Sequence, residues 1–358
     1  MLYKEDWPEA RQRLLAWWEG ELVDRAVIQV TAPRDSRTPD NRWDPFYLAR
    51  HLSDPEKAVA EWEKYCRDTF FGGEMIPNLW INLGPGIPAA YLGCTPRIEP
   101  DTVWFEPPKE LPAWPDILGL SLNPDDYWWE ITRVLSMLAA ESGQGKYFAG
   151  LTDLNSVFDI LCHLRGTQRM LYDLLDHPEE VKQACELVNR IWLACYDELA
   201  RITMRHQEGS AGWMSIWCPG RGGDVQCDFS AMLSPALFEE FVLPHLSEQC
   251  RHLERSIYHL DGPGQLAHLE ILLDIPELDG IQWVPGAGNP QTGSPHWFGM
   301  YRRIQEKGKR LVLQGMAQVD VEGVLKGISG RGLLIETRCD SEAEARALLR
   351  KAEGWTRD

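Results

Sequence analysis

Short apolar runs alternate with longer amphipathic segments along most of the 358-residue chain. Apolar runs of roughly four to eight residues between turn residues predict buried strands, whereas apolar residues at every third or fourth position predict helices. Helical segments separate most of the apolar runs. The eight predicted strands are VIQV, MIPNLWI, YFAGLT, GWMSIW, SIYHLD, GIQWV, LVLQG and LLIET.

Strands that alternate with helices are typical of a parallel α/β architecture. Eight is the number of strands that closes a TIM barrel, so the sequence predicts a single (β/α)8 TIM-barrel domain spanning residues 1–358. The alternative is an open doubly wound sheet, which would carry a glycine-rich phosphate-binding turn after the first strand. No such turn follows VIQV. In a barrel, the active site is built at the carboxyl ends of the strands.

Residues 91–126 interrupt this alternation. Prolines recur through the segment, at positions 96, 100, 107, 108, 112, 115 and 124. The segment is too long for a simple connection, and it therefore predicts an excursion or lid near the barrel mouth. The alternative is an ordered surface hairpin with no functional role.

The chain is acidic, with a formal net charge of −18 and an isoelectric point near 5.0. This charge argues against nucleic acid as a partner, because no basic field is available to contact phosphates. No apolar run reaches the roughly 18 residues of a membrane span, and the first residues are too polar for a signal peptide. Nine scattered cysteines fit reduced thiols, so we expect a cytoplasmic enzyme whose oligomeric state the sequence leaves open.

The stretch RSIYHLDGPG, residues 255–264, combines a strand end with chemically active side chains. An apolar strand stops there at a His-x-Asp pair followed by Gly-Pro-Gly. Side chains on a strand alternate with a period of two, so His259 and Asp261 point to the same side. They are predicted to converge on one metal ion or one substrate group. The simpler alternative is a hydrogen-bonded pair that holds the loop.

Other residues that follow the predicted strands should face the same cavity. They combine carboxylates, amides and flat aromatic rings, with few basic residues nearby, so the cavity should favour a metal ion or a neutral or cationic substrate over a dianion. Glu336, Asp153 and Asn155 are the candidate catalytic residues. The candidate substrate-binding residues are Asn82, Trp217, Trp283 and Gln314.

Four longer segments resemble one known family. They read TDLNSVFDILCHLRG, LLDHPEEVKQACELV, CDFSAMLSPALFEEFVLPHL and LIETRCDSEAEARALL. Their order and spacing resemble those of the uroporphyrinogen decarboxylases and their corrinoid-dependent methyltransferase relatives. The resemblance spans most of the chain from about Gln12 onward, and it implies a TIM barrel that either decarboxylates porphyrinogens or transfers methyl groups to or from a corrinoid protein.

The resemblance favours the methyltransferase branch. The haem-pathway decarboxylases carry an N-terminal arginine cluster and an active-site aspartate, whereas this chain lacks the cluster and has Asn82 near the place of the aspartate. The methyltransferases hold zinc with His-x-Cys and a distant second Cys. By resemblance, His259, Asp261 and Cys339 take these places as zinc ligands, and Cys227 is an alternative thiolate.

Asp261 is a departure, because it stands where the relatives have a thiolate. His, carboxylate and Cys remain an acceptable zinc set with a fourth position open. A carboxylate is a harder ligand than a thiolate and leaves more positive charge on the metal, which suits polarisation of an oxygen or nitrogen leaving group. Trp213, Trp217 and Trp283 would add an aromatic wall for a methylated cation or an aryl methyl ether.

These observations predict a zinc-dependent methyltransferase that moves a methyl group between a small methylated substrate and a corrinoid protein. The chain has no Asp-x-His-x-x-Gly corrinoid-binding signature, so the corrinoid would arrive in trans, on a partner protein that docks at the barrel mouth. Two alternatives stay open. One is a metal-free decarboxylase or lyase with Asp261 or Glu336 as the acid, and the other is a catalytically silent barrel that binds a small ligand.

Overall fold

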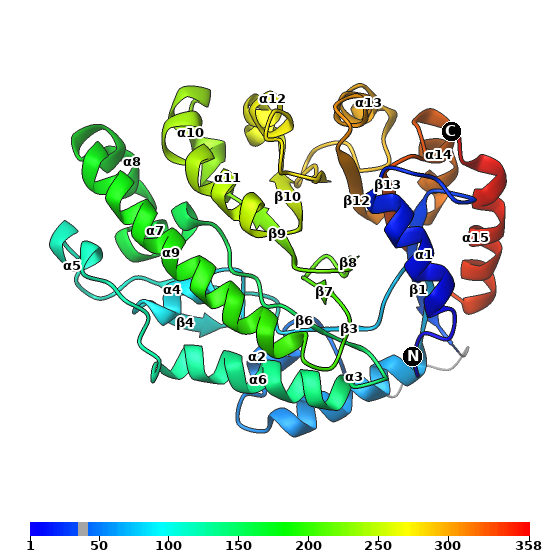
Figure 1. Ribbon diagram of the computed structural model, residues 1–358, viewed down its shortest axis with the longest axis horizontal. Helices are drawn as coiled ribbons and strands as arrows, with labels where there is room; N and C mark the ends of the chain where they lie inside the picture. Colours follow the sequence, from blue (N-terminus) through cyan, green and yellow to red (C-terminus); the bar gives the residue numbers. More distant parts are fainter. Residues whose placement is uncertain (35–41) are drawn as a thin grey trace.

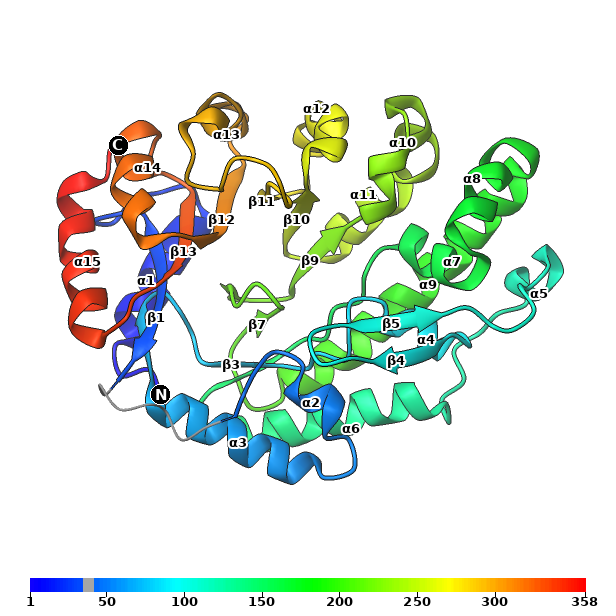
Figure 2. The same cartoon turned by 180° about the vertical axis from the view of Figure 1, so that it is seen from behind.

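The strands lie on the inner side of a curved ring of helices (Figures 1 and 2). The computed structural model describes residues 1–34 and 42–358. Within these ranges the strands are β1 (Val27–Pro33), β2 (Thr69–Gly73), β3 (Asn78–Trp80), β4 (Thr95–Ile98), β5 (Val103–Glu106), β6 (Phe148–Gly150), β7 (Ser210–Ala211), β8 (Trp217–Cys218), β9 (Gly222–Gln226), β10 (Arg255–Asp261), β11 (Gly280–Val284), β12 (Arg310–Met316) and β13 (Leu333–Arg338).

The helices account for most of the remaining chain. They are α1 (Trp7–Trp18), α2 (Tyr47–Arg50), α3 (Pro55–Asp68), α4 (Ile87–Tyr91), α5 (Trp114–Leu118), α6 (Tyr127–Gly143), α7 (Val157–Arg165), α8 (Thr167–Asp176), α9 (Pro178–Thr203), α10 (Pro235–Phe241), α11 (Leu243–His252), α12 (Leu269–Leu273), α13 (Phe298–Glu306), α14 (Val321–Gly327) and α15 (Glu342–Trp355). Four 3-10 turns, η1 (Asp228–Met232), η2 (Pro263–His268), η3 (Pro295–Trp297) and η4 (Gln318–Asp320), lie between them. Across the two described ranges, no helix combines the length and the apolar character needed to cross a bilayer.

Seven strands form one hydrogen-bonded sheet in the order β2-β1-β13-β12-β11-β10-β9. The six from β1 to β9 in this order run parallel, and β2 is antiparallel at the edge. β3 and β6 form a separate parallel pair. The parallel α/β class is therefore confirmed. A closed eight-stranded barrel is not, because strand pairing among the described residues does not run around a complete ring.

The strand predicted over GWMSIW is wrong. The two-residue strand β7 lies just before this segment, and β8 begins at its last residue, Trp217. The two strands pair with each other in antiparallel fashion and lie inside the ring (Figure 1). The parallel sheet instead uses β9, which comes from the glycine-rich segment that follows. Between β7 and β8, residues 212–215 form a turn that we call the inner turn.

Amide side chains from three separate strands hold the inner turn. Buried amides need hydrogen-bond partners, and the carbonyl groups of a turn supply them where a regular strand would use its carbonyls for pairing. Ser215 adopts a φ of 54°, in the left-handed region. Gln29 Nε2 donates to Ser215 O at 2.7 Å, Asn78 Nδ2 to Gly212 O at 2.9 Å and Gln314 Nε2 to Met214 O at 3.0 Å.

Gly212 makes room for a carboxylate beside the inner turn. A Cβ atom at this position would lie 2.1 Å from Asp224 Oδ2, so a larger residue would displace the carboxyl group. Asp224 in turn accepts hydrogen bonds from the backbone N–H groups of Trp213 and Met214. The glycine and the aspartate together fix the turn against β9.

The interior below the inner turn is apolar. Val27, Ile257, Val312 and Leu334, from four strands, form one cluster there with side chains of α1. Leu14, Trp17 and Trp18 of α1 are buried in the same cluster, so this helix closes the amino ends of the strands.

A row of polar side chains lies above this apolar layer. Polar residues follow the apolar cluster residues by two positions on the same strands. Residues two apart on a strand face the same side, so these polar side chains also point into the interior. The strand register aligns Gln29 with Glu336, and it aligns His259 with both Gln226 and Gln282. The parallel strands therefore present their polar groups at one level, toward their carboxyl ends.

The proline-rich segment 91–126 is ordered. It forms the antiparallel β4–β5 hairpin and the short helix α5. Arg165 of α7 holds α5 in place, because its Nη1 donates to Pro112 O at 2.6 Å and its guanidinium lies 4.2 Å from the centroid of the Trp114 ring. Arg165 is also ion-paired with Asp173 at 2.6 Å.

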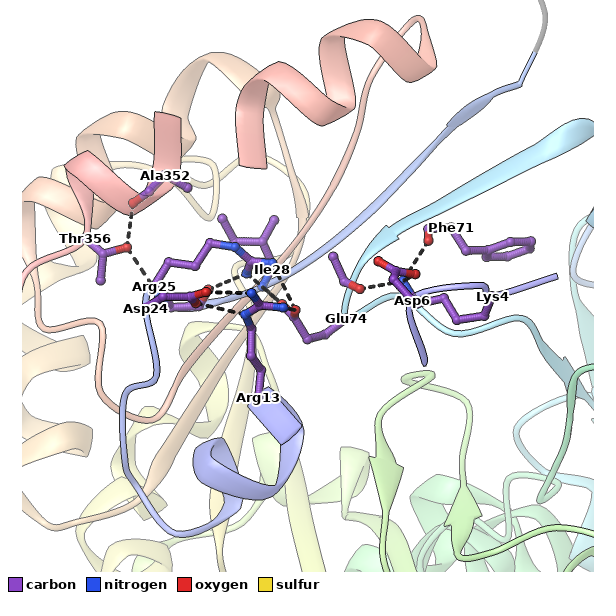
Figure 3. A network of polar contacts seen from close by, with 12 residues as sticks. Lys4, Asp6, Arg13, Asp24, Arg25, Ile28, Phe71, Glu74, Ala352 and Thr356 are labelled. Carbon is purple, nitrogen blue, oxygen red and sulfur yellow. Dashed lines mark hydrogen bonds and ion pairs between the residues drawn. The ribbon is translucent and has the colours of Figure 1, made fainter. Parts of the chain in front are cut away.

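A buried ion pair anchors the amino ends of the strands (Figure 3). The carboxylate of Glu74 is fully buried and accepts hydrogen bonds from Arg25 Nη1 at 2.7 Å, Arg25 Nη2 at 2.9 Å and Ile28 N at 2.9 Å. Nearby, Lys4 Nζ donates to Phe71 O at 2.8 Å. These contacts tie the N-terminal segment, β1 and the end of β2 to one another.

Glu74→Gln should lower the free energy of unfolding by about 3–5 kcal/mol, because it leaves the buried Arg25 guanidinium without its countercharge. Urea denaturation measures the change. The matched control is Glu322→Gln, which breaks an exposed pair with Lys326 and should cost less than about 1 kcal/mol. Equal effects of the two substitutions would contradict the anchoring role of Glu74.

Candidate metal and substrate site

Three ligand-type side chains converge where β9 and β10 end. Asp228 opens η1 directly after β9, and His259 and Asp261 lie at the end of β10. One ligand atom from each of the three lies within 4.8 Å of the others. Gly262, with a φ of 81°, ends the strand, so the two β10 side chains project from the same side, as their spacing predicts. We call Asp228, His259 and Asp261 the triad.

The imidazole of the triad is oriented by its neighbours. Nδ1 of His259 is hydrogen-bonded to the acceptor Gln282 Oε1, which places the ring proton on Nδ1 and leaves Nε2 free to bind a metal. Trp213 of the inner turn packs its ring against the imidazole, with centroids 5.2 Å apart at 87°. Burial lowers the pKa of His259, so the ring is neutral near pH 7.

Asp159 of α7 positions the first triad residue. Its carboxylate accepts hydrogen bonds from Asp228 N at 3.0 Å and Phe229 N at 2.9 Å, which fixes the start of η1. Partial desolvation, reinforced by the charges of Asp159, Asp261 and Asp153, raises the pKa of Asp228, although the residue is exposed at the surface. The carboxylates are thus crowded enough to repel one another, and a bound cation would relieve that repulsion.

A cavity of about 530 Å³ is lined in part by Trp213, the residue that packs against His259 of the triad. Gln314 and Glu336, from β12 and β13, line it, together with Arg338. Burial raises the pKa of Glu336, whose Oε2 accepts a hydrogen bond from Gly315 N at 2.7 Å. The aromatic part of the lining consists of Trp43, Trp62, Tyr65, Phe71, Trp80 and Trp213.

The structure brings four of the residues predicted from the sequence to this region. His259 and Asp261 belong to the triad, and Gln314 and Glu336 line the large cavity. Asp153 lines a separate small cavity together with Asp224 and Trp213. Burial raises the pKa of both Asp153 and Asp224 to about 7.

Asn155 supports the loop after β6. Its φ of 54° is in the left-handed region, where asparagine is among the better tolerated residues. Its Oδ1 accepts a hydrogen bond from Gln226 Nε2 at 3.1 Å, and its N donates to Asp153 Oδ1 at 2.7 Å. Asn155 therefore orients its neighbours.

The two tryptophans predicted to contact substrate are in the core. Trp217 is fully buried on β8, where its Nε1 donates to Glu208 O at 2.7 Å and its ring meets Trp7 of α1. Trp283 is fully buried against Trp297 of η3, with centroids 4.9 Å apart. Because Gln282 faces the interior, its neighbour Trp283 must face the outer helices.

Both polar atoms of the Asn82 side chain form hydrogen bonds with the backbone. Its Nδ2 donates to Pro45 O at 2.9 Å and its Oδ1 accepts from Gly84 N at 3.0 Å. The two cysteine candidates also lie apart from the triad. Burial raises the pKa of Cys339 to about 11 and that of Cys227 well above its usual range, so both are neutral thiols near pH 7.

Sequence reasoning missed Asp228, Gln282 and the aromatic residues between positions 43 and 80. A signal for the polar row was present, because several apolar strands carry a single amide or carboxylate at the same level, as in VIQV, GIQWV and LVLQG. Asp228 lay in a segment interpreted as a loop. Its proximity to β10 depends on β9, which was not predicted.

Comparison with solved structures places the fold among known ones. The chain is similar to a methyltransferase from Methanosarcina mazei, with a TM-score of 0.55 and 12% sequence identity over 96% of this chain and 98% of that chain. No protein-family model matches the chain, and no curated protein sequence matches it. At this level of identity the similarity establishes a methyltransferase-like fold.

Asp224→Asn should alter how stability depends on pH. Burial raises the pKa of Asp224 to about 7 from its ordinary value of 3.8, so the neutral acid favours the folded state at low pH and this advantage is lost as the pH rises through 7. The amide keeps an acceptor oxygen for the inner turn and removes the charge. The melting temperature of the variant, relative to wild type, should therefore rise between pH 4 and pH 8.

The exposed Asp125→Asn is the control for this measurement, and its melting temperature relative to wild type should stay constant over the same range. A constant difference for Asp224→Asn as well would show that Asp224 does not titrate between folded and unfolded states.

Proposed function

We propose that the protein is a metal-dependent methyltransferase that works with a corrinoid protein. The observation that carries the proposal is the triad, in which the ligand atoms of Asp228, His259 and Asp261 lie within 4.8 Å of one another. The fold shared with a methyltransferase from Methanosarcina mazei supports the same class of reaction. The sequence resemblance to the corrinoid-dependent branch supports the choice of partner.

The donor atoms of the triad fit zinc or another divalent cation. One imidazole nitrogen and two carboxylate oxygens are ligands that zinc accepts, and they leave a position open for substrate. Two carboxylates make the set harder than a thiolate site. A metal bound there would act as a Lewis acid that polarises the leaving atom of the methyl donor. Gln282 keeps His259 in the tautomer that such binding needs.

Methyl transfer breaks the bond between the methyl carbon and the leaving atom, and the electron pair of that bond stays on the leaving atom. A Co(I) corrinoid carried by the partner protein would supply the electron pair for the new bond, so the transfer would need no further oxidant or reductant. The leaving atom then requires a proton. Glu336 is a suitable donor, because it lines the cavity and burial raises its pKa.

Protein purified without chelators should contain about one equivalent of zinc or another divalent metal, measured by mass spectrometry of the elements. His259→Ala and Asp228→Asn should each reduce the content to about a tenth or less, because each removes one of three ligands. Cys339→Ser is the matched control and should keep its metal. Loss of metal from Cys339→Ser with retention in Asp228→Asn would instead support the ligand set predicted from the sequence.

Glu336→Gln should slow methyl transfer by about 10²- to 10⁴-fold, because it removes the proton donor. Absorbance of a Co(I) corrinoid protein mixed with the enzyme and a methyl donor measures the rate. The effect should be larger for alkoxide than for phenolate leaving groups, since the weaker leaving group needs the proton more. The exposed Glu353→Gln should react at the wild-type rate, and a Glu336→Gln rate equal to it would exclude the role.

A decarboxylase or lyase is the second candidate. Glu336 lines the large cavity and burial raises its pKa, so its carboxyl group is a candidate proton donor to a carbanion in a reaction that needs no metal. Release of carbon dioxide or an elimination product by the metal-free protein, in the absence of a corrinoid protein, would select this reaction class.

A further inference from the structure

Two 3-10 turns carry the chain away from the carboxylates of the triad. Asp228 is the first residue of η1, and η2 begins at Pro263, two residues after Asp261. The turns lie side by side, and a Cβ atom on Gly264 of η2 would lie only 3.2 Å from the Cβ atom of Ala231 in η1. The distance between the two carboxylates therefore depends on how η1 and η2 are held together.

A buried histidine of η2 makes a polar contact with η1. Nε2 of His268 is hydrogen-bonded to Ser230 O at 2.9 Å, and the imidazole is fully buried. Because a carbonyl oxygen only accepts, Nε2 carries the ring proton and donates it. Nδ1 has no hydrogen-bond partner among residues 1–34 and 42–358, so the bond to Ser230 is the polar contact that this ring makes there.

Packing fixes the position of the same ring. The imidazole of His268 stacks on Phe238 of α10, with centroids 4.5 Å apart and the planes 13° from parallel. Phe238 is itself fully buried. The N–H of His268 is therefore presented to η1 from a rigid part of the core, which is the arrangement that holds metal ligands in place from outside the ligand set.

The backbone of η1 is thus held at two points. Asp159 accepts hydrogen bonds from the N–H groups of Asp228 and Phe229 at the start of the turn, and His268 binds its middle. A link between the turns matters because metal binding requires ionised carboxylates. Those of Asp228 and Asp261 lie within 4.8 Å of each other and repel when both are charged, so the fold must hold them together until a cation binds.

We infer that His268 is a positioning residue of the metal site, whose hydrogen bond to Ser230 ties η1 to η2 and so sets the separation of Asp228 and Asp261. The imidazole supplies no ligand atom and acts through the backbone of the two turns. This inference rests on the proposed function, because it concerns the metal that the triad would bind. Loss of such an outer partner typically weakens metal binding by about 10- to 100-fold.

His268→Phe and His268→Gln separate the hydrogen bond from the packing. Phenylalanine keeps a ring against Phe238 and removes the N–H, whereas glutamine keeps an N–H donor and removes the ring. Zinc affinity, measured by competition with a chromophoric chelator, should fall about 10- to 100-fold in His268→Phe and be largely retained in His268→Gln. A loss in His268→Gln as large as that in His268→Phe would assign the effect to packing and overturn the inference.

Tyr91→Phe is the matched control for a loss of stability. It removes another buried hydrogen bond, in which Tyr91 Oη of α4 donates to Thr132 Oγ1 of α6 at 2.9 Å. Its zinc affinity should equal that of wild type, even where its melting temperature falls as far as that of His268→Phe. Equal losses of zinc affinity in the two variants would assign the effect to general stability and overturn the role of His268.

The visible spectrum of the cobalt(II)-loaded protein reports the arrangement of the ligands. Band intensity and position depend on how many donor atoms surround Co(II) and at what angles, and not on the stability of the fold. At saturating cobalt the spectrum of His268→Phe should differ from that of wild type, and His268→Gln should restore it. Identical spectra of wild type and His268→Phe would show that the ligands keep their arrangement without the N–H, which would overturn the inference.

Hydrogen exchange of the metal-free protein distinguishes failure of this inference from failure of the proposed function. The backbone N–H groups of residues 228–232 and 263–268 should exchange faster in His268→Phe than in wild type. Faster exchange in both turns, with no metal bound by wild type, would overturn the proposed function and support the link between the turns. Zinc binding by wild type, with unchanged exchange and unchanged affinity in His268→Phe, would overturn the role of His268 and support the function.

Discussion

Hydrogen bonding of amide side chains to the inner turn is the constraint on which the site depends. Gln29, Asn78 and Gln314 come from strands far apart in the sequence, yet all three donate to carbonyls of residues 212–215. Each amide would be costly to bury alone, so the turn and the strands stabilise one another. The same turn carries Trp213, which packs against His259 of the triad and also lines the large cavity. One turn therefore sets the geometry of both.

Much of the fold could be predicted from the sequence, because strands that are buried on both faces appear in it as short, continuous apolar runs. Runs such as LVLQG and LLIET are apolar enough to be identified without their neighbours. GWMSIW is also a mostly apolar run, yet it does not form a strand of the parallel sheet. Its conformation depends on distant amides and on Asp224, and no local pattern reports those contacts. β9 was not predicted, because its glycine-rich sequence lacks the apolar run that is typical of a buried strand.

The site was partly predictable for the same kind of reason. His259 and Asp261 share one strand, so their convergence follows from strand periodicity alone. Asp228 joins them from another strand end, and the aromatic wall comes from α3, β2 and nearby segments. Trp283 was predicted to face the cavity, but neighbouring residues on a strand face opposite sides. Its side chain therefore lies in the core between the sheet and the outer helices. Residue types indicate chemistry, but only tertiary packing determines which of them meet.

The pairing of β1 with β13 joins the two ends of the chain. Val27 to Thr31 align with Leu334 to Arg338, and Ala26 N donates to Thr356 Oγ1 at 3.2 Å. During synthesis, β1 leaves the ribosome about 300 residues before its partner strand exists. The apolar face of β1 must therefore be sheltered in the interval, by α1, by β2 or by a chaperone. Pairing of β1 within the sheet is therefore completed only after β13 has been released.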